Sequence, residues 1–121
     1  MLKKRILVVD DDKTILQTTQ SLLHNAGYEV ITHDTPFGAT EMIRTWRPDL
    51  VLLDVNMPGL AGDRLCVLIR GNRRIETKIF FHSSNDETSL RLAVAQYGAD
   101  DYICKGDISG MRRKISQALT N

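Results

Sequence analysis

Three carboxylates in this sequence stand where two short apolar runs end. Asp10 and Asp11 close the run at 6–9, and Asp54 closes the run at 50–53. Carboxylates that share one crevice repel one another and raise one another's pKa values unless a cation lies among them. Since these ligands are all oxygens, with no supporting histidine or thiolate, the predicted cation is a hard one, Mg²⁺ or Mn²⁺.

Asp54 is the candidate nucleophile of this group. A carboxylate at the end of a buried strand costs free energy unless something compensates it, so it is either a paired structural acid or a chemical group held at an edge. If Asp54 attacks a phosphoryl group, an acyl phosphate forms, and the developing charge needs cations and donors already in place. Lys105 after a later apolar run supplies a cation, and Ser83 after another supplies a hydroxyl donor.

The elements that position these residues follow from the apolar spacing. Runs at 5–10, 28–33, 50–54, 77–82 and 100–104 predict five strands. Between and after them, apolar residues recur at helical spacing and predict five helices, with ends uncertain by about three residues. Thr35 and Pro36 are the predicted N-cap and first residue of the second helix. The third helix, 62–71, should bury Leu65, Leu68 and Ile69, and the last should bury Ile108, Met111, Ile115 and Leu119.

Strict alternation of strands and helices predicts the fold class. Strands that are apolar on both faces form a parallel sheet covered by helices on each side, with right-handed crossovers. The expected fold is a doubly wound α/β domain with a five-stranded parallel sheet in the flavodoxin-like order 2-1-3-4-5 and five helices. In that order the first and third strands are neighbours, so the acids flank the crevice at their carboxyl ends.

Length and composition agree with a single domain over 1–121. The chain has 42% hydrophobic and 26% charged residues, which is typical of a globular protein. No apolar run approaches the roughly 20 residues that span a bilayer, so we expect a cytoplasmic protein without membrane contact. A net charge of +1 gives no basic field for direct DNA binding. Cys66 and Cys104 lack metal-ligand spacing and are interpreted as core residues.

Four motifs give the chain a specific resemblance to a known family. They are Ile6-Leu7-Val8-Val9-Asp10-Asp11, Leu53-Asp54-Val55-Asn56-Met57-Pro58-Gly59, Ser83-Ser84, and Gly98-Ala99-Asp100-Asp101-Tyr102-Ile103-Cys104-Lys105. From about residue 4 to residue 119 the sequence resembles a chemotaxis-regulator-like receiver domain of a two-component response regulator. Such domains are phosphoproteins of signal transduction and phosphorelay pathways.

The resemblance implies a role for each site residue. Asp54 would be the phosphoacceptor. Asp10 and Asp11 would bind Mg²⁺ together with Asp54 and the backbone carbonyl of Asn56. Ser83 would hydrogen-bond the phosphoryl oxygen, and Lys105 would pair with it. Tyr102 matches the aromatic switch, which turns inward when the Ser83 hydroxyl is drawn to the phosphate.

The resemblance also implies partners and the limits of the activity. The phosphoryl group would come from a histidine kinase or a histidine phosphotransfer protein. An effector, an output domain or a second copy of the chain would contact the surface of the fourth helix, fifth strand and last helix, expected to carry Arg91, Gln96, Tyr102 and Met111. The domain would catalyse only its own phosphorylation and slow autodephosphorylation, so it is not a turnover enzyme.

One residue departs from the family pattern. Proline usually follows the lysine, often after a cis peptide bond, and Gly106 stands there instead. A cis bond before a non-proline residue costs about 2.5 to 4 kcal/mol, so we expect a trans Lys105–Gly106 bond. Glycine also loosens the loop that carries Lys105.

Several interpretations remain open at this point. Asp12 is interpreted as a helix N-cap rather than a metal ligand, and His82 as a packing residue. Asn56 and Asn85 flank the expected phosphoryl position, and we hypothesise that they set the lifetime of the acyl phosphate by positioning the attacking water. Gly106 is the best argument for an alternative function, a pseudo-receiver that acts as an interaction module without phosphorylation. A small hydrolase with an aspartyl-phosphate intermediate is a third hypothesis, but the chain has no room for a substrate cap.

Overall fold

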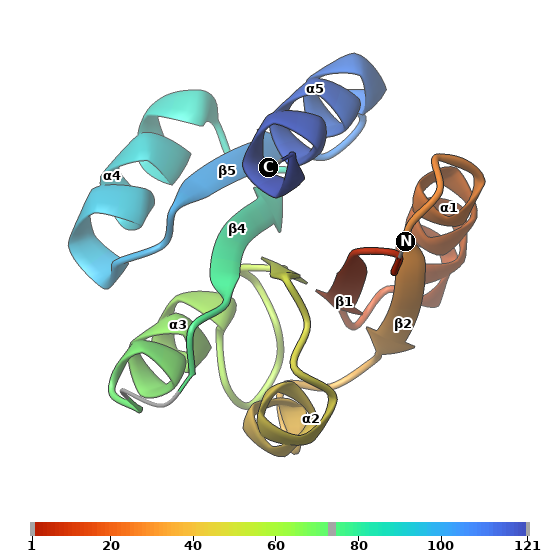
Figure 1. Cartoon of the computed structure of the whole chain (residues 1–121). Coiled ribbons are helices and arrows are strands. Elements are labelled where there is room, and N and C mark those ends of the chain that lie inside the picture. The colour runs from red at the N-terminus through yellow and green to blue at the C-terminus, as the bar shows by residue number, and fades with distance from the viewer. Residues whose placement is uncertain (1, 73–74, 121) are drawn as a thin grey trace.

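A computed structural model describes residues 2–72 and 75–120 of the chain. Across these residues five strands form one parallel sheet in the order β2-β1-β3-β4-β5, and a helix follows each strand (Figure 1). The predicted fold class and strand order are therefore confirmed. In chain order the elements are β1 (Arg5–Val9), α1 (Lys13–Asn25), β2 (Glu29–His33), α2 (Ala39–Trp46), β3 (Leu50–Leu53), α3 (Gly62–Arg70), β4 (Lys78–Ser83), α4 (Glu87–Tyr97), β5 (Asp101–Cys104) and α5 (Ile108–Leu119).

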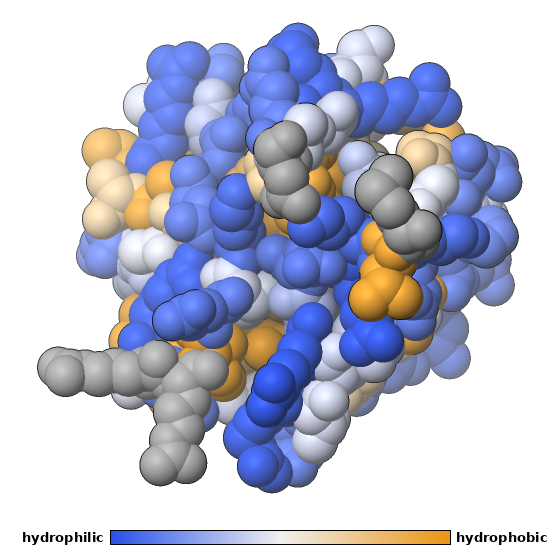
Figure 2. Space-filling model, viewed as in Figure 1, coloured by the Kyte–Doolittle hydropathy of each residue, from blue (hydrophilic) through white to orange (hydrophobic). Residues whose placement is uncertain are grey.

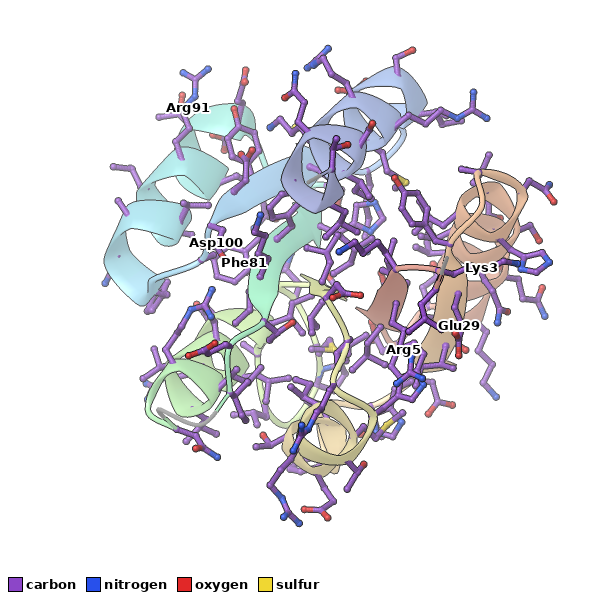
Figure 3. The ribbon with its side chains drawn as sticks, viewed as in Figure 1. Lys3, Arg5, Glu29, Phe81, Arg91 and Asp100 are labelled. Carbon is purple, nitrogen blue, oxygen red and sulfur yellow. The ribbon has the colours of Figure 1, made fainter. Side chains whose placement is uncertain are left out.

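Helices cover both faces of the sheet. Successive strand residues point to opposite faces, so Leu7 and Val9 pack with α2, α3 and α4, whereas Ile6 and Val8 pack with α1 and α5. Phe81, at the centre of β4, is fully buried in the first of these two clusters (Figure 3). The sheet is thus apolar on both faces, and its strand ends are left for polar side chains.

The outer surface of the molecule is mostly polar on the side that Figure 2 shows, with small, separate apolar areas. None of the described helices is both long and apolar enough to cross a membrane. Both cysteines are free, with Cys66 buried and Cys104 half-buried against the core.

Strand register brings the candidate site residues to one edge. Val9 of β1 pairs with Leu53 of β3, so Asp10 and Asp54 leave the sheet side by side. The Asp54 backbone N–H donates to the Val9 carbonyl at 2.9 Å, which extends this pairing into the site. Similarly, the Lys105 N–H donates to the Ser83 carbonyl at 2.8 Å, one step beyond the last paired residues of β4 and β5.

The second helix starts later than predicted. Thr35 and Pro36 lie in a turn, and α2 begins at Ala39 with Gly38 as its N-cap, at φ +82°. The Thr35 hydroxyl accepts a hydrogen bond from the Phe37 N–H at 3.3 Å, so it caps this turn rather than the helix. The left-handed backbone at Gly38, which glycine adopts without strain, separates the turn from the helix.

Two predicted core residues are exposed, and one expected surface residue is buried. In α3 the buried stripe runs through Leu65, Cys66 and Ile69, which leaves Leu68 on the opposite side with 56% of its surface exposed. Ile108, the first residue of α5, lies at the rim of the core and is 44% exposed. Met111 is buried between α5 and the sheet, as predicted for the apolar face of the last helix, so it does not belong to the readout surface that the resemblance assigned to it.

Candidate functional site

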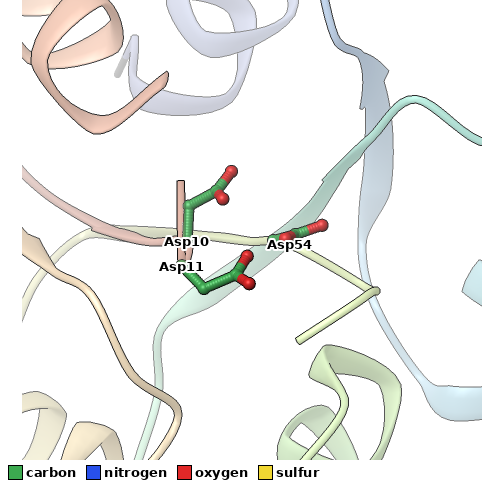
Figure 4. A group of neighbouring side chains, drawn as sticks. All are labelled: Asp10, Asp11 and Asp54. Atoms are coloured by element: carbon green, nitrogen blue, oxygen red, sulfur yellow. The ribbon is translucent and has the colours of Figure 1, made fainter. Parts of the chain in front are cut away.

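Three acids gather where β1 and β3 end. Figure 4 shows the carboxyl groups of Asp10, Asp11 and Asp54 at this edge, and one oxygen from each lies within 4.8 Å of the others. Asp10 and Asp54 are almost completely buried, whereas Asp11 is exposed. The structure therefore brings together the three carboxylates that the sequence singled out.

The environment of Asp54 opposes its ionisation. Burial is the main cause and raises the pKa of this carboxyl to about 6. The N–H of Asn56, which donates to Asp54 Oδ1 at 3.1 Å, acts in the opposite direction. The charge of Asp10 raises the pKa further, and Lys105 lowers it. Asp54 is thus a carboxylate whose charge is incompletely compensated by its neighbours.

Lys105 reaches both buried acids. Its Nζ lies 2.8 Å from Asp10 Oδ2 and 3.5 Å from Asp54 Oδ1. Burial by itself would lower the pKa of this amine, but the hydrogen bond and charge of Asp10, followed by those of Asp54, outweigh burial and raise it. Lys105 is therefore held as a cation inside the site, although the family's usual proline is absent after it.

In the loop after β5, the residue that follows Lys105 has a backbone conformation that proline could not adopt. The Asp107 N–H donates to the Cys104 carbonyl at 3.1 Å, which closes a four-residue turn with Gly106 in third place at φ +91°. A positive φ at this place is typical of glycine, whereas proline is fixed near −65°. The Lys105–Gly106 bond is trans, as expected.

Ser83 is the last residue of β4 rather than the residue after it, and its side chain is fully buried. Its Oγ accepts hydrogen bonds from the Asn85 N–H at 3.1 Å and from Asn56 Nδ2 at 3.4 Å. The Asn56 amide also donates to Asn85 Oδ1 at 2.9 Å. Ser84 is exposed, and Asp86 is the N-cap of α4, where its side chain accepts a hydrogen bond from the Ser89 N–H.

Tyr102 is directed away from Ser83 and toward α4. Its hydroxyl donates to Glu87 Oε1 at 2.5 Å and accepts from Arg91 Nε at 3.2 Å. Arg91 itself projects from α4 into solvent (Figure 3). On α5, Lys114 Nζ lies 3.8 Å from the centre of the Tyr102 ring. Three side chains from α4 and α5 thus hold the aromatic ring in its outward position.

Sequence reasoning missed one positioning residue. Gly62, the first residue of α3, lies so close to the strand end that a Cβ on it would be 2.0 Å from the Asp54 carbonyl oxygen. Its N–H donates to the Val55 carbonyl at 3.1 Å. The available signal was a glycine at a helix start, which by itself indicates a helix boundary and not a close contact with the backbone of Asp54.

Two other expectations concern residues beside the site. The Asp12 side chain accepts from the Thr14 and Ile15 N–H groups, so Asp12 is the N-cap of α1. His82 is buried on the α1 and α5 side, and its Nδ1 has no hydrogen-bond partner among the described residues. Burial is the main cause that lowers its pKa to about 4, so it is a neutral packing residue at physiological pH.

Comparison with known proteins assigns the family. The sequence profile of the response regulator receiver domain matches residues 6–116. The chain belongs to this family. Receiver domains of response regulators act in two-component signalling and bind Mg²⁺ through an acidic pocket, and this receiver domain has a cluster of three acids, Asp10, Asp11 and Asp54.

Named relatives agree with this assignment. The receiver domain is 40% identical over 102 residues to the response regulator MprA of Mycobacterium tuberculosis, covering 84% of this chain and 44% of MprA. It is 36% identical over 104 residues to the alkaline phosphatase synthesis transcriptional regulatory protein PhoP of Bacillus subtilis, covering 86% of this chain and 43% of PhoP. The chain thus spans less than half the length of these two relatives.

Solved structures share the fold along nearly the whole chain. A CheY-like receiver domain protein from Methanospirillum hungatei superposes with a TM-score of 0.85 at 29% identity, over 96% of this chain and 93% of that one. The receiver domain of a Francisella response regulator gives 0.86 at 26% identity, over 96% of both chains.

Proposed function

We propose that this receiver domain takes a phosphoryl group onto Asp54. The observation that supports the proposal is a buried carboxylate with a raised pKa, flanked by two further acids and 3.5 Å from a lysine. In the reaction, an Asp54 oxygen would attack phosphorus and form the acyl phosphate. The bond from phosphorus to the donor nitrogen breaks, and its electron pair leaves with the imidazole of a histidine kinase or a phosphotransfer protein of the same cytoplasmic compartment.

The acid cluster fits a hard divalent ion. All of its side-chain donors are carboxylate oxygens, and the buried Asp10 Oδ2 has the Lys105 ammonium group, 2.8 Å away, as its polar contact among the described residues. Asp10, Asp11, Asp54 and the backbone carbonyl of Asn56 would hold Mg²⁺ or Mn²⁺. The bound ion would supply positive charge to the oxygens of the transferred group.

Lys105 and Ser83 complete the site from the neighbouring strands. Lys105, already 3.5 Å from Asp54 Oδ1, would neutralise charge on the phosphoryl oxygens as it develops. The buried hydroxyl of Ser83 would donate to one of these oxygens. Because Ser83 ends β4 and Lys105 directly follows β5, both groups lie at the edge of the sheet where the phosphoryl group would arrive.

Asn56 and Asn85 stand at the mouth of the site and would set the lifetime of the acyl phosphate. Their side chains are hydrogen-bonded to each other at 2.9 Å. From this place they can position or exclude the water that hydrolyses the acyl phosphate. We expect variants of Asn85 with bulky side chains to change the dephosphorylation rate.

Phosphorylation would be transmitted through Ser83 and Tyr102. When Ser83 moves toward the phosphoryl group, space opens for the Tyr102 ring, which would leave Glu87 and turn inward. The surface of α4, β5 and α5 would change with it, and an output domain, an effector or a second copy of the chain would read this change.

Acetyl phosphate gives a direct test. With Mg²⁺ present, the wild-type chain should gain the mass of one phosphoryl group, and Asp54→Asn should gain none. Asp63→Asn, which changes an acid on α3 that is not part of the cluster, serves as a matched control and should be phosphorylated normally. The presence of all three acids and of Lys105 argues against the pseudo-receiver function. A wild-type chain that stays unmodified would instead support it.

A further inference from the structure

The side chain of Asn56 makes contacts that the proposed phosphorylation does not by itself require. The backbone N–H of Asn56 donates to Asp54 Oδ1 at 3.1 Å, whereas its side-chain amide crosses to the loop after β4. There Nδ2 lies 2.9 Å from Asn85 Oδ1 and 3.4 Å from Ser83 Oγ. One residue therefore touches both the candidate nucleophile and the candidate hydroxyl donor.

The hydrogen bonds of Ser83 define where its hydroxyl proton can point. A serine hydroxyl has one donor hydrogen and two acceptor lone pairs. The Asn85 N–H, at 3.1 Å, and the Asn56 amide are both donors, so they occupy the two lone pairs. The hydroxyl hydrogen must turn away from both groups. Because Ser83 is fully buried, bulk water does not compete for these positions.

We propose that the Asn56 side chain is a positioning residue that aims the Ser83 hydroxyl proton at the phosphoryl group on Asp54. The inference rests on the proposed phosphorylation of Asp54 and adds a role that differs from the positioning of water. Asn85 contributes twice, since its N–H fills one lone pair of Ser83 and its side-chain oxygen fixes the orientation of the Asn56 amide.

Only a donor at position 56 can fill this role. Aspartate has nearly the same shape as asparagine, but as a carboxylate it accepts hydrogen bonds and donates none. It would attract the Ser83 proton to itself and away from the phosphoryl oxygen. Alanine would leave one lone pair of Ser83 without its donor, so the hydroxyl would sample other rotamers.

A double-mutant cycle tests the inference. The rate of phosphorylation by acetyl phosphate at saturating Mg²⁺ is measured by intact mass for the wild type, Asn56→Ala, Ser83→Ala and the double variant. We expect Asn56→Ala to slow phosphorylation about tenfold, as loss of one transition-state hydrogen bond would. In the Ser83→Ala background the same change should have little further effect, because the hydroxyl it orients is gone. Ser84→Ala, an exposed neighbour, is the control and should leave the rate unchanged.

Three results would overturn the inference, and they are distinguishable. Independent, multiplicative effects in the cycle would mean that Asn56 does not act through Ser83. A change in dephosphorylation alone would assign Asn56 to water positioning. A wild-type chain that takes no phosphoryl group would overturn the proposed function and this inference together.

A second measurement does not depend on phosphorylation. The Asn85 amide proton is bonded to Ser83 Oγ, so its NMR resonance reports the state of that hydroxyl. Asn56→Ala should shift this resonance more in the wild-type background than in the Ser83→Ala background, because the direct contact of Asn56 with the Asn85 side chain is lost in both. The remaining amide spectrum shows that the fold is retained. Equal shifts in the two backgrounds would also contradict the inference.

Discussion

Lys105 lies nearer to Asp10 than to Asp54, with Nζ at 2.8 Å from the first carboxylate and 3.5 Å from the second. Lys105 therefore serves as the counter-ion of a proposed metal ligand as well as of the proposed nucleophile. A divalent ion that binds Asp10 must share this carboxylate with the ammonium group. The lysine thus opposes metal binding while it prepares the site for the phosphoryl group.

We predict that Lys105→Met tightens Mg²⁺ binding and slows phosphorylation. Removal of one positive charge from a buried site should increase the affinity of the acids for Mg²⁺ by about tenfold or more, because a change of about 1.4 kcal/mol in binding free energy corresponds to a tenfold change in Kd. Calorimetric titration with Mg²⁺ measures the affinity. Lys3→Met, at an exposed position in the N-terminal segment, should leave the affinity unchanged. Weaker binding by Lys105→Met would show that the lysine supports the metal site.

The raised pKa of Asp54 predicts a pH-dependent stability. The carboxyl has a pKa of about 6 in the folded chain against 3.8 in the unfolded one, so the folded state binds more protons between these values. Stability therefore falls as pH rises through this window, and the charged Asp54 destabilises the fold above it. Asp54→Asn should be more stable than the wild type at about pH 8, by about 2 to 3 kcal/mol, and equally stable near pH 4.

Urea unfolding in the presence of a chelator measures this difference. Asp34→Asn replaces an exposed acid after β2 and should give no gain at either pH. A stability gain in Asp54→Asn that is equally large near pH 4 would mean that packing, and not ionisation, causes it. Addition of Mg²⁺ should stabilise the wild type more than Asp54→Asn, because the variant lacks one proposed ligand charge.

Most of the site could be predicted because its residues follow apolar strands of one parallel sheet. Asp10, Asp54 and Lys105 each follow an apolar strand, and parallel pairing brings such ends to one edge. The bridge between Asn56 and Asn85 could not be predicted in the same way, because it joins two loops whose relative placement no periodicity specifies. Gly62 was missed for a similar reason, since its contact with the Asp54 carbonyl depends on how α3 approaches the sheet.

Two predictions that were wrong concern the start of α2 and the buried face of α3, where the local sequence pattern allows more than one structure. Thr35 and Pro36 have the composition of a helix start, yet Gly38 in the left-handed region delays α2 to Ala39. In α3, either Cys66 or Leu68 could accompany Leu65 and Ile69 on an apolar face. The face against the sheet takes the smaller cysteine, and the leucine is left in solvent.

The outward position of Tyr102 depends on Glu87, whose Oε1 accepts a hydrogen bond from the Tyr102 hydroxyl at 2.5 Å. We predict that Glu87→Gln weakens this contact and raises the inward population of Tyr102 about twofold, a small effect because the network is exposed. Side-chain NMR couplings of Tyr102 measure the two rotamers. Glu41→Gln breaks a comparable exposed pair with Arg44 on α2 and should not change them. An unchanged rotamer population in Glu87→Gln would assign the outward position to Lys114 and the packing of the ring.

Gly106 should tolerate alanine poorly, although space around it is open. No atom lies within 4 Å of a Cβ placed there, but its φ of +91° is unfavourable for residues with a side chain. We predict that Gly106→Ala destabilises the chain by about 1 to 2 kcal/mol and slows phosphorylation, because the strained turn carries Lys105. Gly71→Ala is the matched control: that glycine has a φ of −68° and ordinary contacts, so urea unfolding should show little change. Equal stability of the two variants would mean that the turn relaxes without cost.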